Sequence, residues 1–314
     1  MSGLGITAYG CEHDEADLLQ ELSPRFGIAP TITSEAASER NVVSVPRNRC
    51  ASVGHKSEIS RPVLRALHDV GVEHISTRSI GVNHIDLSAA ARLGITVENA
   101  AYDPDGVADY TVMLVLMAIR DAKAIVGSAG TNDFRLPRVR GRDLRDLTVG
   151  VVGVGNIGRA VITRLHGFGC RVLTTNGVSL DELLRVSDVV TLHVALNPST
   201  HHLIGPREIA TMKPGSLLVN TGRGALVDTE ALVVALEDGT LGGAALDVLE
   251  GEEGLFYFDC SDRAIDHRLL LRLQGLSNVI ITPHAAYYTH RALRDTIEQT
   301  LSKCRAFERR RSHG

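Results

Sequence analysis

Short apolar runs alternate with stretches of helical periodicity through the first hundred residues. The runs at 5–9, 50–53, 74–77 and 96–98 predict strands. Between them, apolar positions recur at helical spacing and predict helices at 14–22, after Ser60 and at 87–93. We expect Ser60 to be an N-cap, with Pro62 in the first turn, and Gly94 to end the third helix. This order predicts a compact α/β unit.

The next stretch, 105–129, has the pattern of one long helix. Its apolar middle, 112–119, is too continuous for a surface helix and suits burial between two domains, so we expect a domain boundary here. Residues 132–145 then carry several arginines: Arg135, Arg138, Arg140, Arg142 and Arg145. They could form a phosphate-binding or partner-binding arm, but the aspartates among them favour a solvated excursion.

Strand and helix patterns alternate through the rest of the chain. Strands are predicted at 147–152, 171–174, 189–194, 216–220, 244–248 and 279–282, and helices at 180–185, 207–212, 229–237 and 291–308. Such alternation is typical of parallel sheets covered on both faces. We therefore predict an α/β fold of two Rossmann-like or flavodoxin-like domains. A dinucleotide-binding domain, 102–284, would be inserted in a discontinuous substrate domain, 1–101 and 285–314.

A glycine pattern connects the strand at 147–152 to the helix that follows. Gly153, Gly155 and Gly158 form G-x-G-x-x-G between a β-branched run and positions of helical spacing. The first glycine permits a tight turn, the second lets a pyrophosphate approach the backbone, and the third lets the helix pack closely on the strand. Free N–H groups at the helix start would face the anion. A tight turn without a ligand is the alternative, but the flanking strand and helix favour dinucleotide binding.

Composition narrows the class of protein. The chain has 314 residues, more than one core usually holds, and its net charge of −4 provides no basic field for nucleic acid or a membrane. The N-terminus lacks the pattern of a signal peptide, and the apolar run at 112–119 is too short to span a bilayer. The five cysteines are scattered, and no histidines cluster at ligand spacing. We expect a reduced, metal-free cytoplasmic protein.

Residues suited to carboxylate binding and acid–base chemistry follow several of the later strands. Arg223 stands between two glycines after 216–220, where its fork suits a planar carboxylate and the glycines let a ligand approach. His284 follows the last strand, and Glu250, Glu252 and Glu253 follow 244–248. Histidine exchanges protons near neutral pH, and a carboxylate would orient its ring. Surface positions are the alternative, but the shared location at strand ends favours an Arg/Glu/His site.

Five blocks, in the same order, resemble the D-isomer-specific 2-hydroxyacid dehydrogenases. They are 78–86, 153–158, 220–224, 244–248 and 282–284, and the resemblance extends over nearly the whole chain. Within the family, the chain is most similar to the D-lactate dehydrogenases, in particular those of vancomycin resistance. This further similarity rests on 6–12, 52–60, 249–253 with Phe256 and Tyr257, and 284–289.

The resemblance implies a catalytic set and a reaction. Arg223 would bind the substrate carboxylate, His284 would be the general acid/base, and Glu252 would be the partner of His284. The implied reaction is the reduction of pyruvate, or of a small 2-oxo acid, to D-lactate by NADH or NADPH. Protonated His284 would give its proton to the ketone oxygen. The D-lactate would supply cell-wall precursors that end in D-Ala-D-Lac.

The resemblance also implies residues that bind substrate and cofactor. The N–H groups of Ser79, Ile80 and Gly81 would hold the carboxylate, and Tyr102 and Tyr287 would line a pocket for a small side chain. The implied cofactor contacts are Gly153, Gly155, Asn156, Ile157, Gly158, Asn176, His193, Val194, Ala195, Thr221, Arg223 and Asp247.

One position departs from the family pattern. NAD-selective relatives carry Asp about 20 residues after the glycines, where it binds the adenosine ribose, but here the second strand is followed by Asn176. Without that carboxylate a 2′-phosphate is not repelled, so NADPH could be accepted or preferred. The connection after Thr175 is also roughly ten residues shorter than the family pattern, and βα connections can be short. The alternative is that a loop which selects between NAD and NADP is missing at this position.

Alternative functions remain open at this stage. A different 2-oxo acid could be the substrate, because pocket contacts distinguish one methylene by only about 1–3 kcal/mol. The family also includes nicotinamide-binding corepressors, although the complete Arg/Glu/His set favours an enzyme. Family members are commonly dimers joined through the cofactor domain. The stretch 132–145 and the neighbouring long helix are therefore candidates for the contact in a homodimer.

Overall fold

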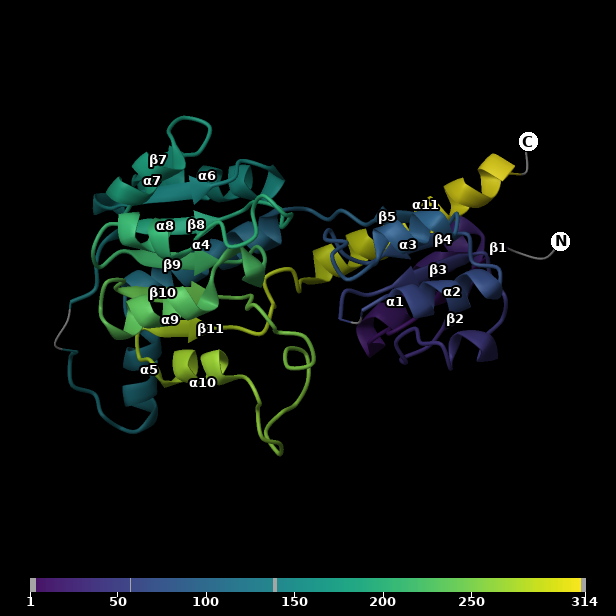
Figure 1. Ribbon diagram of the computed structural model, residues 1–314, viewed down its shortest axis with the longest axis horizontal. Helices are drawn as coiled ribbons and strands as arrows, with labels where there is room; N and C mark the ends of the chain where they lie inside the picture. The colour runs from purple at the N-terminus through teal and green to yellow at the C-terminus, as the bar shows by residue number, and fades with distance from the viewer. Residues whose placement is uncertain (1–3, 57, 138–139, 312–314) are drawn as a thin grey trace. The chain divides into compact units, whose positions relative to one another are not determined.

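The computed structural model describes residues 4–56, 58–137 and 140–311, and it divides into two compact units. The first unit combines Met1–Asp103 with Tyr288–Gly314, and the second is Pro104–Tyr287. Each unit has a parallel sheet with helices on both faces, as Figure 1 shows. The predicted α/β fold with parallel sheets is therefore confirmed.

The first unit is built on a five-stranded sheet in the order β2-β1-β3-β4-β5, with every pair parallel. The order 2-1-3-4-5 is that of a flavodoxin-like fold. The strands are β1 (Leu4–Ala8), β2 (Ile28–Ile32), β3 (Cys50–Val53), β4 (His74–Thr77) and β5 (Thr96–Asn99). The helices are α1 (His13–Phe26), η1 (Val42–Ser44), α2 (Arg61–Asp69), α3 (Leu87–Arg92) and α11 (His290–Arg311).

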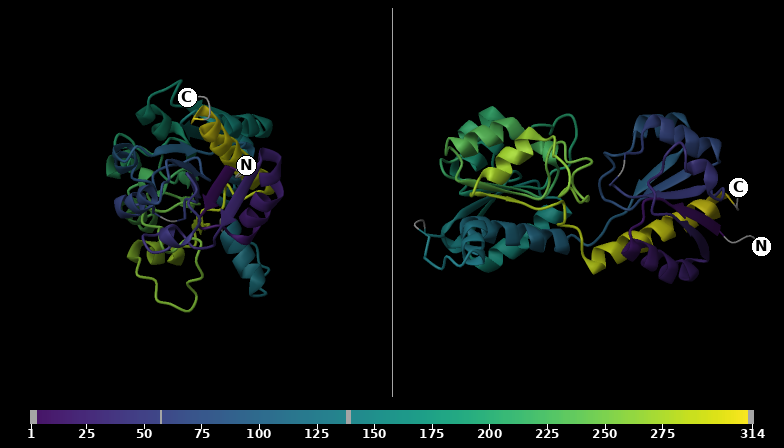
Figure 2. Two further views of the ribbon diagram at one scale, coloured as in Figure 1. Left: turned by 90° about the vertical axis from the view of Figure 1, so that its right-hand side faces the viewer. Right: turned by 90° about the horizontal axis from the view of Figure 1, so that it is seen from below.

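Two apolar cores lie on the two faces of this sheet. Helices α2 and α3 contribute Leu64 and Ala90 to one core, and α1 and α11 contribute Leu19, Ile297 and Leu301 to the other. Figure 2 shows the two helix pairs on opposite sides of the sheet. Helix α11 therefore returns to the first unit after the second unit is complete.

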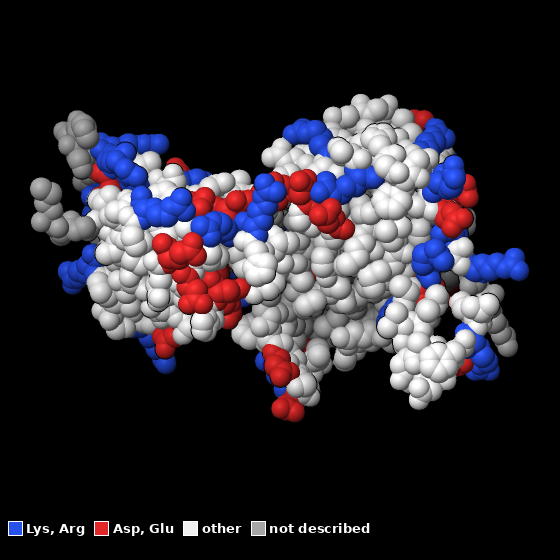
Figure 3. All heavy atoms as spheres, turned by 180° about the vertical axis from the view of Figure 1, so that it is seen from behind, with Lys and Arg blue, Asp and Glu red and all other residues white. Residues whose placement is uncertain are grey.

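The surface carries charged side chains of both signs. Lys and Arg side chains are interspersed with Asp and Glu on the face in Figure 3, in keeping with the net charge of −4. Of the described helices, none has both the length and the apolar character needed to cross a membrane.

The second unit is built on a six-stranded parallel sheet in the order β11-β10-β9-β8-β6-β7. Its strands are β6 (Thr148–Val152), β7 (Arg171–Thr174), β8 (Val189–Leu192), β9 (Leu217–Asn220), β10 (Gly243–Leu246) and β11 (Val279–Ile281). Its helices are α4 (Asp105–Ile119), α5 (Ala122–Gly130), η2 (Leu144–Asp146), α6 (Asn156–Phe168), α7 (Leu180–Val186), α8 (Pro206–Thr211), η3 (Gly224–Leu226), α9 (Thr229–Glu237) and α10 (Arg268–Gly275). The strand order reverses at β6, as in Rossmann-like folds.

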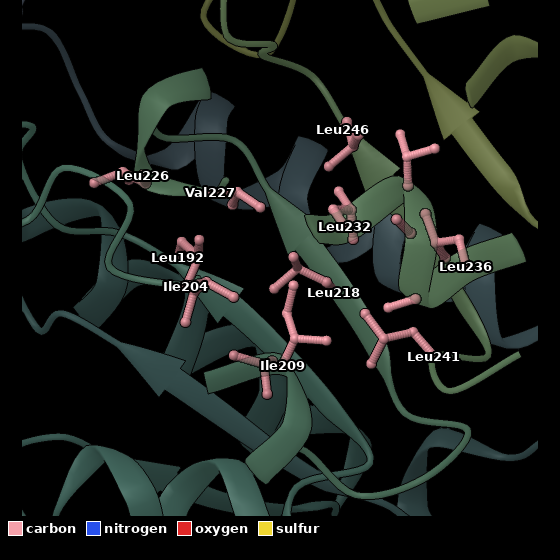
Figure 4. Close-up of a cluster of buried hydrophobic side chains, with 14 of the residues drawn as sticks. Leu192, Ile204, Ile209, Leu218, Leu226, Val227, Leu232, Leu236, Leu241 and Leu246 are labelled. Carbon is pink, nitrogen blue, oxygen red and sulfur yellow. The ribbon is translucent and has the colours of Figure 1, made fainter. Parts of the chain in front are cut away.

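Apolar cores again fill both faces of this sheet. In the core of Figure 4, Leu192 and Leu218 on the sheet pack with Ile209 of α8 and with Leu232 and Leu236 of α9. The opposite core joins α4 and α6 to the same sheet. Because both faces are buried, the strands are nearly continuous runs of apolar residues.

The strands of the second unit end in register. The final residues of five strands pair in succession: Val152, Leu192, Asn220, Leu246 and Ile281. The residue after each of these strands therefore starts at the same edge of the sheet: Gly153, His193, Thr221, Asp247 and Thr282. In open α/β sheets this carboxyl edge is where ligands bind.

The predicted long helix at 105–129 is wrong, because the structure has two helices there. Asp121 separates α4 from α5 and has a left-handed backbone with φ 51°, which ends the first helix. Helix α4 packs on α6 and on the sheet of its own unit, so its apolar residues belong to that core. The division between the two units falls just before this helix, between Asp103 and Pro104. Helix α5 contributes no buried residue.

Several smaller expectations also differ from the structure. Strand β2 and helix α10 were not predicted, and β2 contains Pro30, which suits an edge strand. Ser60 is at the N-cap of α2, but its side chain accepts no hydrogen bond there. In the stretch 132–145, Arg135 is exposed and pairs with Asp133, with Nη2 2.6 Å from Oδ2, as expected of a solvated excursion. Arg138 lies outside the described residues.

Candidate active site

The glycine turn between β6 and α6 has the geometry that a dinucleotide needs. A Cβ at Gly153, where φ is 96°, would lie 2.6 Å from the carbonyl oxygen of His193. A Cβ at Gly158 would lie 2.0 Å from the carbonyl oxygen of Gly153. At Gly155 a Cβ would meet nothing within 4 Å. The protein itself therefore requires the outer two glycines, whereas Gly155 faces open space where a pyrophosphate would approach the start of α6.

The turn after β7 lacks an acidic side chain. Asn176 is exposed two residues after the strand, in a turn closed by a bond from the Gly177 N–H to the Thr174 carbonyl at 2.9 Å. The connection to α7 is the short stretch 175–179, and the Thr175 hydroxyl accepts from the Gly153 N–H at 3.2 Å. The position at which the family resemblance implies a carboxylate thus carries a neutral amide.

Other predicted cofactor residues lie at the same sheet edge with different exposures. The Nε2 of His193 lies 2.9 Å from the Thr191 hydroxyl, and desolvation lowers the pKa of His193 to about 4. This imidazole is therefore neutral at neutral pH. The Thr221 hydroxyl is buried and lies 2.8 Å from that of Thr111, so it is used inside the protein. The remaining predicted residues range from half-buried to exposed: Asn156, Ile157, Val194 and Ala195.

His284 and Glu252 form a close pair at this edge. The Nδ1 of His284 lies 2.6 Å from Oε1 of Glu252, and the two side chains are only 16% and 18% exposed. The second oxygen of Glu252 accepts from the Leu249 N–H at 2.7 Å, which fixes the carboxylate. Of the other acids considered, Glu250 instead contacts His202 at 2.8 Å, and Glu253 is exposed. The geometry thus brings Glu252, alone of these three, to His284.

Asp247 holds the segment that carries His284. Its carboxylate is fully buried and accepts from the Thr282 hydroxyl at 2.6 Å and from the N–H groups of Ala285 and Ala286, both at 2.9 Å. The His284 N–H also donates to the Asp247 carbonyl at 2.7 Å. His284 has a left-handed backbone with φ 55°, which non-glycine residues adopt only where the surroundings enforce it. All of these Asp247 contacts are internal to the protein.

Two tyrosines surround the His284 ring. The Tyr257 hydroxyl donates to the His284 carbonyl at 3.3 Å, and the ring centroids are 5.8 Å apart. Tyr287 meets the His284 ring edge-on at 6.1 Å. The pKa of Tyr257 is raised, mainly by burial and further by Tyr287 and Glu252. Tyr257 was not among the predicted site residues, and its sequence signal is only its place in the block of family similarity.

Arg223 projects from the turn after β9. Its Nη1 donates to the Gly222 carbonyl at 2.7 Å, and within the part of the chain that the structure describes no carboxylate pairs with it. Its charge acts on the Tyr257 phenol, opposing the rise of that pKa, so Arg223 lies within electrostatic reach of Tyr257. Glycine is required at position 224, because a Cβ there would lie 2.1 Å from the Leu249 carbonyl carbon. Because no carboxylate of the described chain pairs with the Arg223 guanidinium, this group is suited to an anionic ligand.

In the first unit, the loop Ser79–Gly81 follows β4 at the carboxyl edge. Its three carbonyls accept from the Ala100 N–H, the Asn99 side chain and the Ser79 hydroxyl, at 3.1, 2.7 and 2.7 Å. No acceptor within the described chain is bonded to the N–H groups of these three residues. Consecutive N–H groups of this kind can bind an anion. Tyr102, the other predicted substrate residue of this unit, is half-buried.

A second polar cluster lies beside the Arg223 turn. The side chains of His201, His202 and Glu250 have nitrogen and oxygen atoms within 4.8 Å of one another, although the sequence spacing suggested no such cluster. The two imidazole rings stack with centroids 4.0 Å apart and planes 28° apart. The His202 side chain bonds to Glu250, and the His202 backbone N–H donates to the Ala225 carbonyl at 2.8 Å, so His202 is tied both to Glu250 and to the Arg223 turn.

Comparisons with known proteins agree with this architecture. Residues 112–286 match the family model for the NAD-binding domain of D-isomer-specific 2-hydroxyacid dehydrogenases. A D-specific alpha-keto acid dehydrogenase of Enterococcus faecium is 60% identical over 321 residues, covering 100% of both chains. Its counterpart from Enterococcus faecalis is 57% identical, covering 99% of this chain and 98% of that one.

Solved structures show the same two-unit design. The pyruvate reductase of Chlamydomonas reinhardtii superposes with a TM-score of 0.87 at 30% identity, covering 97% of this chain and 96% of that one. D-2-hydroxyisocaproate dehydrogenase superposes with a TM-score of 0.86 at 28% identity, with the same coverage. Together with the glycine turn and the His284–Glu252 pair, these similarities show that the chain belongs to the D-isomer-specific 2-hydroxyacid dehydrogenase family and is an oxidoreductase that uses NAD(H) or NADP(H).

Proposed function

We propose that the protein reduces pyruvate, and other small 2-oxo acids, to D-lactate and its homologues. The observation that carries the proposal is the pair of His284 and Glu252, 2.6 Å apart. Arg223, which has no carboxylate partner in the described chain, acts electrostatically on Tyr257, and Tyr257 in turn donates to the His284 carbonyl. A 2-oxo acid presents a carboxylate beside a ketone. The site offers a cation for the first group and a proton donor for the second.

His284 is the proposed proton donor to the ketone oxygen. Glu252 accepts the Nδ1 hydrogen, so it orients the ring and leaves Nε2 as the nitrogen that addresses the substrate. The carboxylate also stabilises the positive charge of the imidazolium before the proton is transferred. The bound reduced nicotinamide supplies the hydride that adds to C2. Neutral His193 is unsuited to the donor role, because its pKa of about 4 leaves it without a proton to give near pH 7.

The substrate carboxylate is proposed to bind Arg223 and the N–H groups of Ser79, Ile80 and Gly81. Arg223 offers a planar fork, and the loop offers consecutive N–H donors whose carbonyls are already bonded within the protein. An anchored carboxylate would fix which face of the ketone is reduced and hence the D configuration of the product. Tyr102 and Tyr287 are proposed to limit the size of the side chain.

The cofactor is proposed to contact the carboxyl edge of the second unit. Gly155 and the start of α6 would take the pyrophosphate, and Asp247 and Thr221 would act near the nicotinamide half through the segments that they hold. Asn176 carries no charge to repel a 2′-phosphate, so we propose that both NADH and NADPH are accepted.

The biological setting is also part of the proposal. The relatives from two enterococci are named as D-specific alpha-keto acid dehydrogenases. Together with the sequence blocks shared with the enzymes of vancomycin resistance, this supports supply of D-lactate for cell-wall precursors that end in D-Ala-D-Lac. We place the reaction in the cytoplasm and propose that the protein acts as a homodimer.

Initial rates with a panel of substrates test the proposed function. Pyruvate, 2-oxobutyrate and glyoxylate would each be assayed with NADH and with NADPH, and the chirality of the product would be determined. We expect reduction of pyruvate to D-lactate with either cofactor. Binding of cofactor without turnover of any of these acids would overturn the proposal and indicate a nicotinamide-sensing binding protein.

Substitution of His284 tests the mechanism. General acid catalysis typically contributes about 10²–10⁴-fold, so we expect His284→Ala to lower kcat by that order. Glu252→Gln should also lower kcat, because the imidazolium loses its carboxylate. The matched control is Glu253→Gln, which neutralises the exposed neighbouring acid and should leave kcat within about twofold of the wild type. Equal losses at 252 and 253 would contradict the assignment of Glu252.

A further inference from the structure

We propose that Thr77 and His84 are positioning residues for the substrate carboxylate, acting through the loop Ser79–Gly81. The inference rests on the proposed function and adds two residues that do not touch the substrate. Thr77 is the last residue of β4 and is fully buried, and His84 is half-buried five residues after the loop begins. Thr77 contacts the loop through its hydroxyl group, and His84 contacts the Thr77 hydroxyl through Nε2.

The hydrogen bonds that connect His84, Thr77 and the loop all have the same donor-to-acceptor direction. The Ser79 hydroxyl lies 2.7 Å from the Gly81 carbonyl oxygen, which can only accept, so Ser79 donates its single hydrogen there. The Thr77 hydroxyl, 2.8 Å from that of Ser79, must then donate to Ser79. The Nε2 of His84, 3.0 Å from the Thr77 oxygen, must in turn donate to Thr77. The chain of donors is His84, Thr77, Ser79 and finally the Gly81 carbonyl, and it requires the His84 tautomer with hydrogen on Nε2.

This chain of donors determines which side of the loop faces outward. It ties the Gly81 carbonyl to the interior, while Asn99 and the Ala100 N–H bind the carbonyls of Ile80 and Ser79. With the carbonyls turned inward, the N–H groups of the loop face the other way and have no acceptor in the described chain. A preorganised row of donors binds an anion without first paying the entropy of ordering the loop.

The sheet places the Thr77 hydroxyl for this task. Thr77 pairs in register with Val53 and Asn99, at the carboxyl edge of β3, β4 and β5. The preceding residue, Ser76, has its hydroxyl 3.3 Å from that of Thr300 of α11, on the opposite face of the strand. Two adjacent buried hydroxyls thus serve different neighbours, and this provides a matched control.

The test compares KM with kcat in variants of the two hydroxyls. Thr77→Val keeps the shape but breaks the chain of donors, so we expect KM for pyruvate to rise roughly tenfold with kcat within about twofold. The Kd for NADH should be unchanged. Ser76→Ala should keep the wild-type KM. Thr77→Ser, which restores a hydroxyl, should have a KM close to that of the wild type.

A second pair of variants covers the case in which Thr77→Val does not fold. His84→Leu removes the donor and should raise the KM for pyruvate. His84→Gln offers an amide N–H in place of Nε2 and should bring KM back to the wild-type value. A wild-type KM in Thr77→Val, or an equal rise in Ser76→Ala, would overturn the inference while pyruvate reduction by the wild type still stands. Failure of the wild type to reduce any 2-oxo acid would overturn the proposed function and this inference together.

Discussion

His284 reaches its position through a backbone conformation that few residues adopt. A left-handed φ of 55° costs of the order of 1–3 kcal/mol at a non-glycine residue. Asp247 offsets this cost, because its carboxylate and carbonyl together accept from Thr282, His284, Ala285 and Ala286. The imidazole is therefore oriented before any ligand binds, which is the arrangement that lowers the cost of reaching the transition state.

The sequence indicated some of these residues and missed others for a physical reason. Arg223, Glu252 and His284 could be proposed because each is a chemically distinctive residue shortly after a strand, and the structure places Glu252 against His284. Tyr257 was not proposed, because its approach to His284 depends on a φ of 71° that no local pattern signals. The internal bonds of Asp247 were missed as well, since they depend on how the segment after β11 turns back.

The burial of His193 can be tested through the pH dependence of the protein's stability. Its pKa of about 4 in the folded protein lies below the ordinary 6.5, so between these values the unfolded chain binds more protons. Stability should therefore fall as the pH decreases from about 6.5 to about 4. Urea unfolding of the cofactor-free protein at about pH 7.5 and about pH 5 measures this loss.

Substitution of His193 tests whether its imidazole causes the loss of stability at low pH. His193→Gln cannot take up the proton, so the loss of stability between the two pH values should be smaller than in the wild type. His13→Gln changes a histidine whose side chain is 91% exposed and should keep the full wild-type loss. An identical loss in His193→Gln and the wild type would show that this imidazole is not the cause.

At the scale of elements, the three glycines of the β6–α6 turn are needed for different reasons. Gly153 and Gly158 make room for the protein's own backbone, whereas Gly155 has room to spare in the absence of a ligand. A sequence motif cannot distinguish these cases, because all three appear as the same residue. The structure separates the two positions that folding requires from Gly155, which we propose to serve binding.

Two alanine substitutions should separate these roles. Gly155 has φ −66°, which alanine adopts readily, so Gly155→Ala should unfold at the wild-type urea midpoint while its Kd for NADH rises. Gly158→Ala forces a methyl group against the Gly153 carbonyl and should lower stability by about 1–3 kcal/mol. Urea unfolding and fluorescence titration with NADH measure the two effects. A large loss of stability in Gly155→Ala would contradict the distinction.

The arrangement of elements could largely be predicted, but several boundaries could not. Buried parallel strands such as β8 and β9 are plain in the sequence as apolar runs with both faces covered. The break between α4 and α5 was missed, because Asp121 is an ordinary helix residue by composition and ends α4 only through its left-handed backbone. Strand β2 was missed because it lies at the sheet edge and contains a proline.

At the scale of the whole molecule, α5 and the stretch after it carry exposed large apolar side chains. This helix buries none of its residues, and Val126, Phe134 and Leu136 are 70%, 78% and 93% exposed. Large apolar side chains that gather on a surface usually mark a contact with a partner. The same stretch is the candidate contact of the proposed homodimer.

Charged substitutions at this surface test the dimer. We expect the wild type to sediment as twice its 33.7 kDa mass and the variant Phe134→Asp with Leu136→Asp to sediment as a monomer. The control is Val43→Asp, which places the same charge at an exposed apolar residue of the first unit and should leave the dimer intact. A monomeric wild type would contradict the homodimer, and an unchanged double variant would place the contact elsewhere.

The route of the chain through the two units has a consequence for biosynthesis. Residues 104–287 are continuous, so this unit can complete its fold as soon as it has left the ribosome. The first unit cannot, because Ile297, Leu301 and Cys304 of α11 complete one of its cores and are translated only after the whole second unit. During translation, the face of β1 and β3 that α1 and α11 share is therefore only partly covered until α11 is made. The part of the protein that is made first is the part that finishes folding last.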